Sequence, residues 1–217
     1  MIVHADLRSS LNGVLQQGRR MSCLSCATST AHGLVATTPE DLSVEYLFYH
    51  SVQQMPAANP DEGTTFDATA SALLFEGQPA EHVWPYANTQ AYGADWNPPA
   101  HSAPLHKAHL DSVPSNFDDI AAQFLQGRAV VMGLIITDSF YQCDHSGMLP
   151  LLTPDTERAG HAVLGIGSAS YGADQFILVR NSWGAGWGMS GHAWLSRAYL
   201  ELHLIEARMV AQKRIGP

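Results

Sequence analysis

The sequence predicts an α+β fold in which a helical part precedes an antiparallel sheet or barrel. Segments with helical spacing of apolar residues dominate the first half, and runs rich in β-branched residues follow. The strands come after the helices and do not alternate with them, which argues against a parallel βαβ sheet. The 217 residues, 46% of them hydrophobic, can bury a sizeable core as one domain or as two packed lobes.

Four helices are expected, each with an identifiable start or stop. The first is rich in small residues, which allow close backbone approach, and Cys23 lies in its first turn. Thr64 and Asp67 form a variant of the capping box at the start of the third, and Ser115 is expected to cap the fourth. Glycine or proline follows each segment. The predicted helices span residues 22–33, 43–55, 64–77 and 115–127.

The pattern changes to strands after residue 127, while residues 78–114 have no regular period. That irregular stretch is rich in Pro, Gly, Asn and His and is typical of a functional or lobe-joining segment. No internal repeat or low-complexity tract is present. The predicted strands are runs of β-branched and apolar residues bounded by turn residues, at 129–137, 161–167, 175–180 and 191–195.

Charge and cysteine content exclude several classes of protein. A net charge of −9 argues against binding to nucleic acid or to an anionic membrane, and the pair Arg19-Arg20 is interpreted as solvated surface. Three cysteines cannot all pair, which favours reduced thiols in a cytosolic compartment. The N-terminal residues lack the pattern of a signal peptide, and no apolar run has the length of a membrane span.

One cysteine, one histidine and one asparagine stand at positions that suggest thiol chemistry. Cys23 begins a predicted helix, His161 opens an apolar strand, and Asn181 directly follows another strand and starts a turn rich in Gly and Trp. A histidine can accept the proton of a thiol, and an asparagine can orient the imidazole ring. The three residues therefore form a candidate nucleophile system.

With these residues the chain resembles the papain-like cysteine peptidases. The resemblance implies the two-lobed papain-like fold as one domain over 1–217, with a helical lobe over about 15–112. It also implies a β lobe over about 113–205 joined by an N-terminal strand, and a C-terminal tail over 206–217. The motifs occur in the family's order: Gln17-Gly18, Cys23, Leu42-Ser43-x-Glu45-Tyr46-Leu47, Trp84-Pro85-Tyr86, Gly160-His161-Ala162-Val163, and Arg180-Asn181-Ser182-Trp183-Gly184 with Gly186-Trp187-Gly188.

The resemblance assigns a role to each matching residue. Cys23 matches the nucleophile, His161 the general base and acid, and Asn181 the residue that holds the imidazole. Gln17 matches the side-chain donor of the oxyanion hole, and Trp183 the indole that shields the His–Asn hydrogen bond. A thiol in the first turn of a helix beside an imidazolium has a lowered pKa and can rest as thiolate. The implied reaction is hydrolysis of peptide bonds through a Cys thioester, without a cofactor or metal.

The resemblance also places substrate contacts. Residues 61–66 lie where the family pairs a glycine-rich strand with extended substrate, so Gly63 and Thr64 are expected to bind peptide backbone. Gly160 is expected near the pocket for the residue that precedes the scissile one, and Trp183 lines the same cleft. The partner is therefore a protein or peptide substrate.

Cys26 is interpreted as core packing, because only Cys23 has the family's spacing from Gln17. Leu24 departs from the family, since a typical member has Trp at that position. The disulfides of secreted members and an inhibitory prosegment are not expected either. These departures indicate a divergent, bacterial-type branch.

Several alternatives remain open at this stage. Cys23 and Cys26 also form a C-x-x-C pair, which with Cys143 and His145 offers ligands for zinc or a redox couple. A Cys–His–Asn system also supports deamidation of glutamine or transglutaminase-type acyl transfer, because the same thioester serves all three. A domain of this kind suits a bacterial cytosolic enzyme, or a toxin or effector delivered into another cell's cytosol and restrained by an immunity protein.

Overall fold

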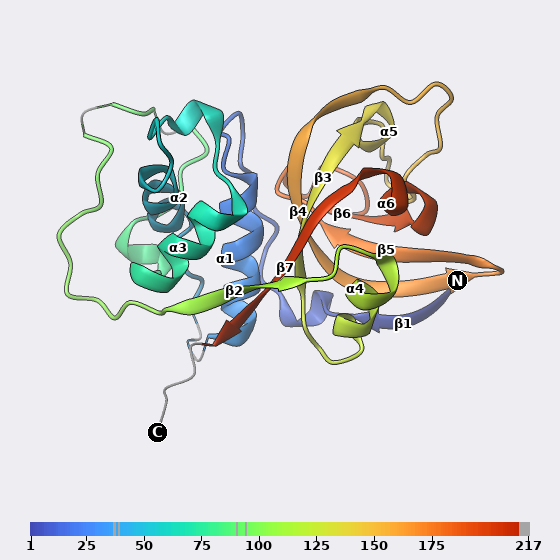
Figure 1. The fold of residues 1–217 in the computed structure, drawn as a ribbon, viewed down its shortest axis with the longest axis horizontal. Coiled ribbons are helices and arrows are strands. Elements are labelled where there is room, and N and C mark those ends of the chain that lie inside the picture. The colour runs from blue at the N-terminus through green and yellow to red at the C-terminus, as the bar shows by residue number, and fades with distance from the viewer. Residues whose placement is uncertain (37, 39, 90, 94, 213–217) are drawn as a thin grey trace. The chain divides into compact units, whose positions relative to one another are not determined.

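The computed structural model describes residues 1–212 apart from 37, 39, 90 and 94, and contains two compact units (Figure 1). Unit 1 consists of Met1–Gln16 and Ser112–Met209. Among the described residues, unit 2 consists of Gln17–Asp111 and of 210–212. No helix among the described residues is both long and apolar enough to cross a membrane.

Unit 1 is built on an antiparallel sheet with short helices beside it. The strand order is β2-β7-β3-β4-β5-β6, and β1 pairs with β4. The residues of β2 and of β7 are divided between the two units. The elements are β1 (Ile2–Asp6), η1 (Arg8–Ser10), β2 (Ala108–Val113), α4 (Phe117–Phe124), β3 (Val130–Thr137), α5 (Asp138–Tyr141), β4 (Glu157–Tyr171), β5 (Asp174–Arg180), β6 (His192–Ser196), α6 (Arg197–His203) and β7 (Leu204–Gln212).

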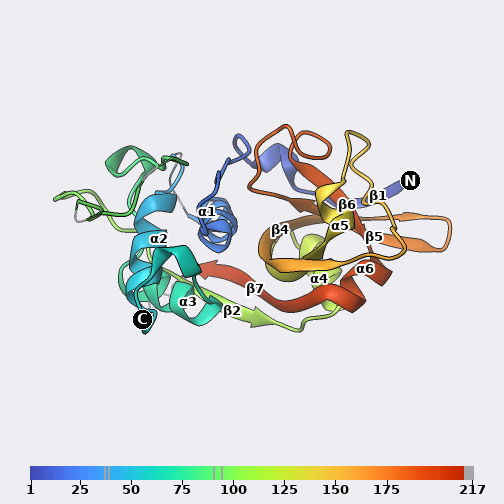
Figure 2. The same cartoon turned by 90° about the horizontal axis from the view of Figure 1, so that it is seen from above.

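The long strand β4 connects three neighbours and curves as it does so (Figures 1 and 2). Its first half pairs with β3, its second half with β1, and it pairs with β5 from Leu164 to Tyr171. The register with β5 shifts between Gly165 and Gly167, so a bulge bends the strand there. A Cβ at Gly167 would lie within van der Waals overlap of the Ala5 carbonyl oxygen, so a glycine is needed where β1 approaches.

The core of unit 1 lies between the sheet and the helices α4 and α6. Apolar side chains that point inward from alternate strand positions meet the buried faces of the helices. These residues supply the apolar burial that holds the curved sheet in place. The largest fully buried ones are Phe124, Phe140, Ile120, Met132, Leu134, Ile136 and Ile177.

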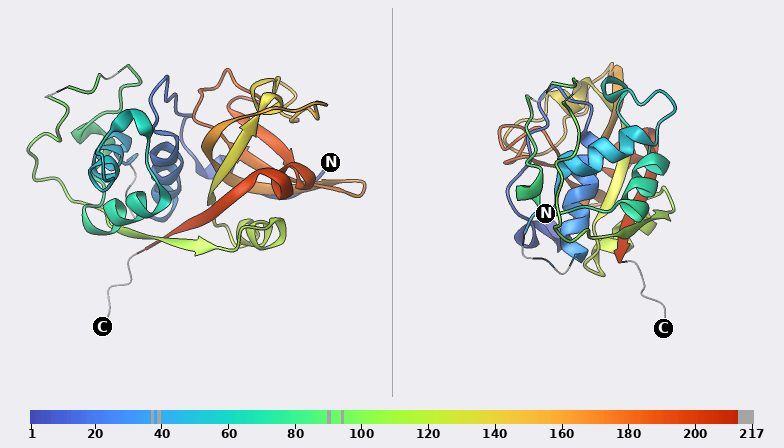
Figure 3. Two further views of the ribbon diagram at one scale, coloured as in Figure 1. Left: turned by 45° about the horizontal axis from the view of Figure 1, so that its top comes forward. Right: turned by 90° about the vertical axis from the view of Figure 1, so that its left-hand side faces the viewer.

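The described part of unit 2 contains three α-helices, which appear in blue to teal in Figure 3. They are α1 (Cys23–Val35), α2 (Val44–Gln53) and α3 (Phe66–Phe75), with the 3₁₀ turns η2 (Pro60–Glu62) and η3 (Glu81–Val83). Phe48 and Val52 of α2 are fully buried and pack with Trp96 from the irregular segment. The small residues of α1 are buried, as the sequence predicts for a helix that packs closely.

The predicted α+β class and the positions of the four main helices are confirmed. Three helix boundaries differ by a few residues. Thr65, not Thr64, caps α3 by accepting from Ala68 N, and Asn116, not Ser115, caps α4 by accepting from Asp119 N. Gly33 does not end α1, which continues to Val35 because Gly33 keeps a helical conformation. Adjacent residues of similar capping ability explain the first two shifts.

The strand boundaries also differ at two places. Strand β4 begins at Glu157, so His161 lies inside the strand and does not open it. Residues 206–212, within the segment interpreted as a tail, belong to β7, and Glu206, Ala207 and Arg208 pair with β3. The apolar residues of β7 are spaced irregularly, and Ala207 and Val210 are the buried ones, so the strand lacks a clear alternation in the sequence. The rest of the predicted tail, 213–217, lies outside the described residues.

A buried polar network joins α1, α2 and the irregular segment of unit 2. The Gln78 amide nitrogen donates to Ser29 Oγ at 2.8 Å and to the Ser43 carbonyl at 2.9 Å. Both of its N–H bonds are thus used, and the amide oxygen accepts from His32 Nδ1 at 2.8 Å. Burial lowers the pKa of His32 to about 4, against the opposing effect of this hydrogen bond. The imidazole is therefore neutral at neutral pH.

We expect His32 to make stability depend on pH. Between about pH 6.5 and pH 4 the unfolded state binds a proton that folded His32 does not, so the free energy of unfolding falls as the pH falls. From pH 6.5 to 4.5 the loss due to this group is about 2 kcal/mol. His32→Gln should remove that loss in urea titrations at the two pH values. The exposed His145→Gln is the matched control, and an unchanged pH dependence in His32→Gln would contradict this prediction.

Candidate active site

Cys23 is the first residue of α1, as the sequence predicts, and its thiol is partly exposed. Ser22 precedes it as the N-cap residue, and its hydroxyl forms a 2.6 Å hydrogen bond with Tyr86 Oη. The first turn of a helix carries backbone N–H groups without intrahelical partners, and this end of the helix dipole favours negative charge. The position therefore suits a thiolate.

Gln17 lies in the loop that leads into α1, and its side chain is buried. Its amide nitrogen donates to the Arg20 carbonyl at 2.8 Å. Gly18 has φ +65°, and a Cβ there would stand 2.7 Å from the Asn88 carbonyl oxygen. A side chain at residue 18 would thus be strained by its backbone and would collide with a neighbour. Only glycine fits directly after Gln17.

Arg20 is buried, so its interpretation as solvated surface is wrong. Its side chain is 4% exposed and forms a 2.5 Å ion pair with Glu45, whose side chain is 1% exposed. Sequence spacing alone could not reveal this pair, because its partners are 25 residues apart on different elements. Arg19, the adjacent residue, is exposed as predicted.

His161 and Asn181 meet inside unit 1. His161 lies in β4, Asn181 directly follows β5, and His161 Nε2 is 2.7 Å from Asn181 Oδ1. The backbone N–H of Ser182 donates to the same oxygen at 2.8 Å. A backbone N–H can only donate, so this atom is the amide oxygen and His161 Nε2 must carry the proton. The neutral ring therefore has an unprotonated Nδ1, which can accept a proton.

Aromatic rings enclose the imidazole. The Trp183 ring centroid lies 4.9 Å from that of His161, as expected for a shielding indole, and Phe140 lies 5.7 Å away. Trp183 in turn stacks on Tyr141 at 5.1 Å and meets Phe140 edge to face at 5.4 Å. Phe140 and Tyr141 come from the short helix α5 and were not among the predicted site residues. No motif marked them, since their contact with Trp183 arises only from the fold.

Burial lowers the pKa of His161 to about 4, and the hydrogen bond with Asn181 acts in the opposite direction. Because of this low pKa, the imidazole ring in its surroundings within unit 1 is neutral near pH 7. An imidazole in this state is a base that accepts a proton at Nδ1 while Asn181 holds Nε2. A negative charge beside the ring would raise this pKa again.

The predicted substrate-binding residues lie in both units. Gly160 is exposed in β4, and no atom would stand within 4 Å of a Cβ there. Gly63 has φ +75°, and a Cβ there would lie 3.1 Å from the Met21 carbonyl oxygen. Thr64 Oγ1 lies 3.3 Å from Thr69 Oγ1. Residues 61–66 do not form one extended strand. Asp61 and Glu62 belong to η2, which Asn59 caps, and Phe66 begins α3.

Cys26 is a buried core residue, as predicted from its spacing. It is 1% exposed, and burial, followed by the charge of Cys23, raises its pKa to about 12. Such a thiol is protonated at neutral pH and is therefore not a ready nucleophile. Cys143 is also a buried free thiol with a pKa raised by burial to about 11. Within the part of the chain described, no group of three His, Cys, Asp or Glu side chains is arranged to hold a metal ion.

Comparisons with known proteins agree with these features. The model of the papain family cysteine proteases matches residues 3–212. An uncharacterised peptidase C1-like protein of Acanthamoeba polyphaga mimivirus is 29% identical over 84 residues, which are 37% of this chain and 26% of the viral protein. The match thus spans about a quarter of that relative's length.

Solved structures of cysteine proteases have the same fold. Xylellain, a cysteine protease from Xylella fastidiosa, has a TM-score of 0.82 at 22% identity, over 97% of this chain and 86% of that one. A Carica candamarcensis cysteine protease in complex with E-64 has a TM-score of 0.72 at 22% identity, over 96% and 98% of the two chains. Because the family model covers nearly the whole chain, this protein belongs to the papain family of cysteine proteases.

Proposed function

We propose that this chain is an endopeptidase that hydrolyses protein substrates through a thioester on Cys23. The observation that carries the proposal is the pair of hydrogen bonds to Asn181 Oδ1, from His161 Nε2 and from Ser182 N. Together they leave His161 Nδ1 as the proton acceptor. Cys23 at the start of α1 and family membership support the same chemistry.

In the proposed reaction, His161 Nδ1 takes the proton of the Cys23 thiol, and the sulfur attacks the scissile carbonyl carbon. The oxyanion that forms is stabilised by the Gln17 amide and the backbone N–H of Cys23. The imidazolium then gives its proton to the leaving amine, and the C–N bond breaks to leave a thioester. His161 next takes a proton from water, and the attack of that water releases the acid and restores the thiol.

We propose that Gly63 and Thr64 bind the extended backbone of the substrate and that Gly160 and Trp183 line its path near the scissile bond. The open space beside Gly160 supports a close approach of peptide backbone at this residue. Main-chain hydrogen bonding of this kind recognises peptides with little regard for sequence.

Cys23 should be the only cysteine labelled by an epoxysuccinyl thiol-protease inhibitor. Cys23→Ala is expected to abolish the mass increase of the intact protein, because Cys26 is buried and protonated. Cys26→Ala is the matched control and should keep the label. The opposite pattern, with labelling lost only in Cys26→Ala, would contradict the assignment of the nucleophile.

His161 should titrate differently with and without the Cys23 thiol. In Cys23→Ala, burial should keep the imidazole neutral down to about pH 4. In the wild-type protein, a Cys23 thiolate would favour the charged ring and raise its pKa above that in Cys23→Ala. ¹⁵N NMR of histidine-labelled protein measures both curves. Identical curves in the two proteins would show that no such ion pair forms.

We also propose that the enzyme acts in a reducing cytosol, either in its own cell or as an effector restrained by an immunity protein. Three free cysteines and an acidic chain support the reducing compartment. The effector role predicts that expression in bacteria is toxic and that Cys23→Ala removes the toxicity, as measured by colony counts after induction. Harmless expression of a protein that labels fully at Cys23 would count against this role.

A further inference from the structure

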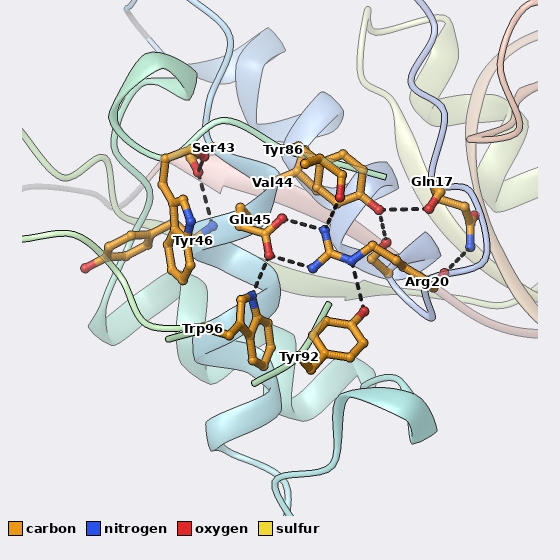
Figure 4. Close-up of polar contacts among 12 residues, drawn as sticks. Gln17, Arg20, Ser43, Val44, Glu45, Tyr46, Tyr86, Tyr92 and Trp96 are labelled. Carbon is orange, nitrogen blue, oxygen red and sulfur yellow. Dashed lines mark hydrogen bonds and ion pairs between the residues drawn. The ribbon is translucent and has the colours of Figure 1, made fainter. Parts of the chain in front are cut away.

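The inference concerns Arg20 in the loop between Gln17 and Cys23, and it rests on the proposed function. The Arg20 guanidinium is surrounded by partners of unit 2 (Figure 4). Its Nη1 and Nη2 donate to the two carboxylate oxygens of Glu45, each at 2.5 Å. Nε donates to Tyr92 Oη at 3.0 Å, and Nη1 also donates to the Ala87 carbonyl at 2.9 Å. These hydrogen bonds thus fix the orientation of the guanidinium plane as well as its position.

Aromatic rings complete the enclosure of this cation. The Arg20 guanidinium carbon lies 4.7 Å from the ring centroid of Tyr86, 5.0 Å from that of Tyr92 and 5.4 Å from that of Phe48. Glu45 is held on its other side by Trp96 Nε1, which donates to Oε1 at 2.6 Å. Burial by itself would lower the pKa of Arg20, but the hydrogen bonds with Glu45 and Tyr92 raise it above its ordinary value. The charge is permanent.

Stability alone does not account for a buried pair of this kind. Removing two charges from water costs about as much as their attraction returns, and apolar residues of similar volume often serve as well. The pair does, however, fix the backbone of the residue to which the guanidinium belongs. The Arg20 carbonyl accepts the amide N–H of Gln17 at 2.8 Å, and the Arg20 N–H donates to the Gln17 carbonyl at 3.4 Å.

Tyr86 also contacts the loop that contains Gln17, Arg20 and Ser22. Its hydroxyl donates to the Gln17 carbonyl at 3.1 Å and forms a 2.6 Å hydrogen bond with Ser22, while its ring lies against the Arg20 guanidinium. An amide nitrogen has two N–H bonds in one plane, so the bond given to the Arg20 carbonyl sets the direction of the other. That other N–H is the donor assigned to the oxyanion.

We propose that Arg20 is a positioning residue for the oxyanion hole: its ion pair with Glu45 fixes the Arg20 carbonyl, which orients the side-chain amide of Gln17. The residue touches neither substrate nor sulfur. Arg20 acts through Gln17. Its loss leaves the nucleophile Cys23 in place, but the side-chain amide N–H of Gln17 no longer points towards the oxyanion.

The position of Gln17 can be measured without any activity. In ¹⁵N-labelled protein, the wild-type Gln17 side-chain amide should give two separate proton signals that exchange slowly with water. In the neutral pair Arg20→Met/Glu45→Gln, which leaves no buried charge alone and keeps an acceptor for Trp96, these signals should move towards those of a free amide and exchange faster. Unchanged Gln17 signals in this folded variant would overturn the proposal, whether or not Cys23 reacts.

The catalytic consequence separates oxyanion stabilisation from thiol reactivity. Cleavage of fluorescein-labelled casein should fall by roughly 10²-fold in Arg20→Met/Glu45→Gln, the size of effect seen when one oxyanion donor is lost. The rate at which iodoacetamide alkylates Cys23 should stay within about 2-fold, because that displacement at a saturated carbon forms no oxyanion. A parallel fall of both rates would show a merely structural role and overturn the proposal.

A double-mutant cycle gives the last arm of the test. Gln17→Ala should lose casein cleavage to a similar extent, and adding the Arg20 change to it should cost nothing more, since both remove the same donor. Additive losses would overturn the proposal. Arg19→Met, a change of the exposed neighbouring arginine, is the matched control and should keep wild-type cleavage. If iodoacetamide does not alkylate Cys23 in the wild-type protein, the proposed function is refuted. The role of Arg20 is then still tested by the NMR signals of the Gln17 amide.

Discussion

The buried charge of Arg20 is the constraint that orders much of unit 2. A guanidinium inside a protein needs a counter-charge and acceptors for its N–H groups, and these come from places far apart in the chain. Glu45 is on α2, whereas Ala87, Tyr92 and Trp96 belong to a stretch without regular secondary structure. That stretch is therefore held to one ion pair by the Ala87 carbonyl and by the side chains of Tyr92 and Trp96.

The architecture could be predicted from the sequence because it depends on local patterns. Apolar spacing and turn residues indicated the helices and most strands, and the position of Asn181 directly after a strand was correct. The run of small residues that follows Ser22 likewise indicated the start of α1. The predicted N-cap residues were wrong by one position, because the actual caps Thr65 and Asn116 each follow a neighbour of equal capping ability.

Contacts between distant segments could not be predicted in this way. Arg20 beside exposed Arg19 has the composition of a surface pair, and only the fold shows that Glu45 lies against it. Phe140 and Tyr141 beside Trp183 had no signal in the sequence for the same reason. The roles of Cys23 and His161 came from resemblance to a family, and the structure adds what resemblance cannot give: which ring nitrogen carries the proton.

The proposed catalytic residues are ordered separately by the two units. Gln17 and Cys23 belong to unit 2 and are held by its loop and by α1, whereas His161 and Asn181 belong to unit 1 and are held by strands β4 and β5. Each pair therefore depends on the core of its own unit for its geometry. Changes that loosen one core should disturb one pair and leave the internal geometry of the other intact.

The hydrogen bond from His161 to Asn181 has a consequence for isotopes. The Nε2 proton is buried, is held at 2.7 Å between nitrogen and oxygen, and has the Trp183 ring beside it. In the proposed reaction, by contrast, Nδ1 takes up a proton and gives it away in every turnover. On transfer into heavy water, the hydrogen that Nδ1 takes up should be deuterium from the first turnover, while Nε2 still carries protium until its hydrogen bond with Asn181 opens.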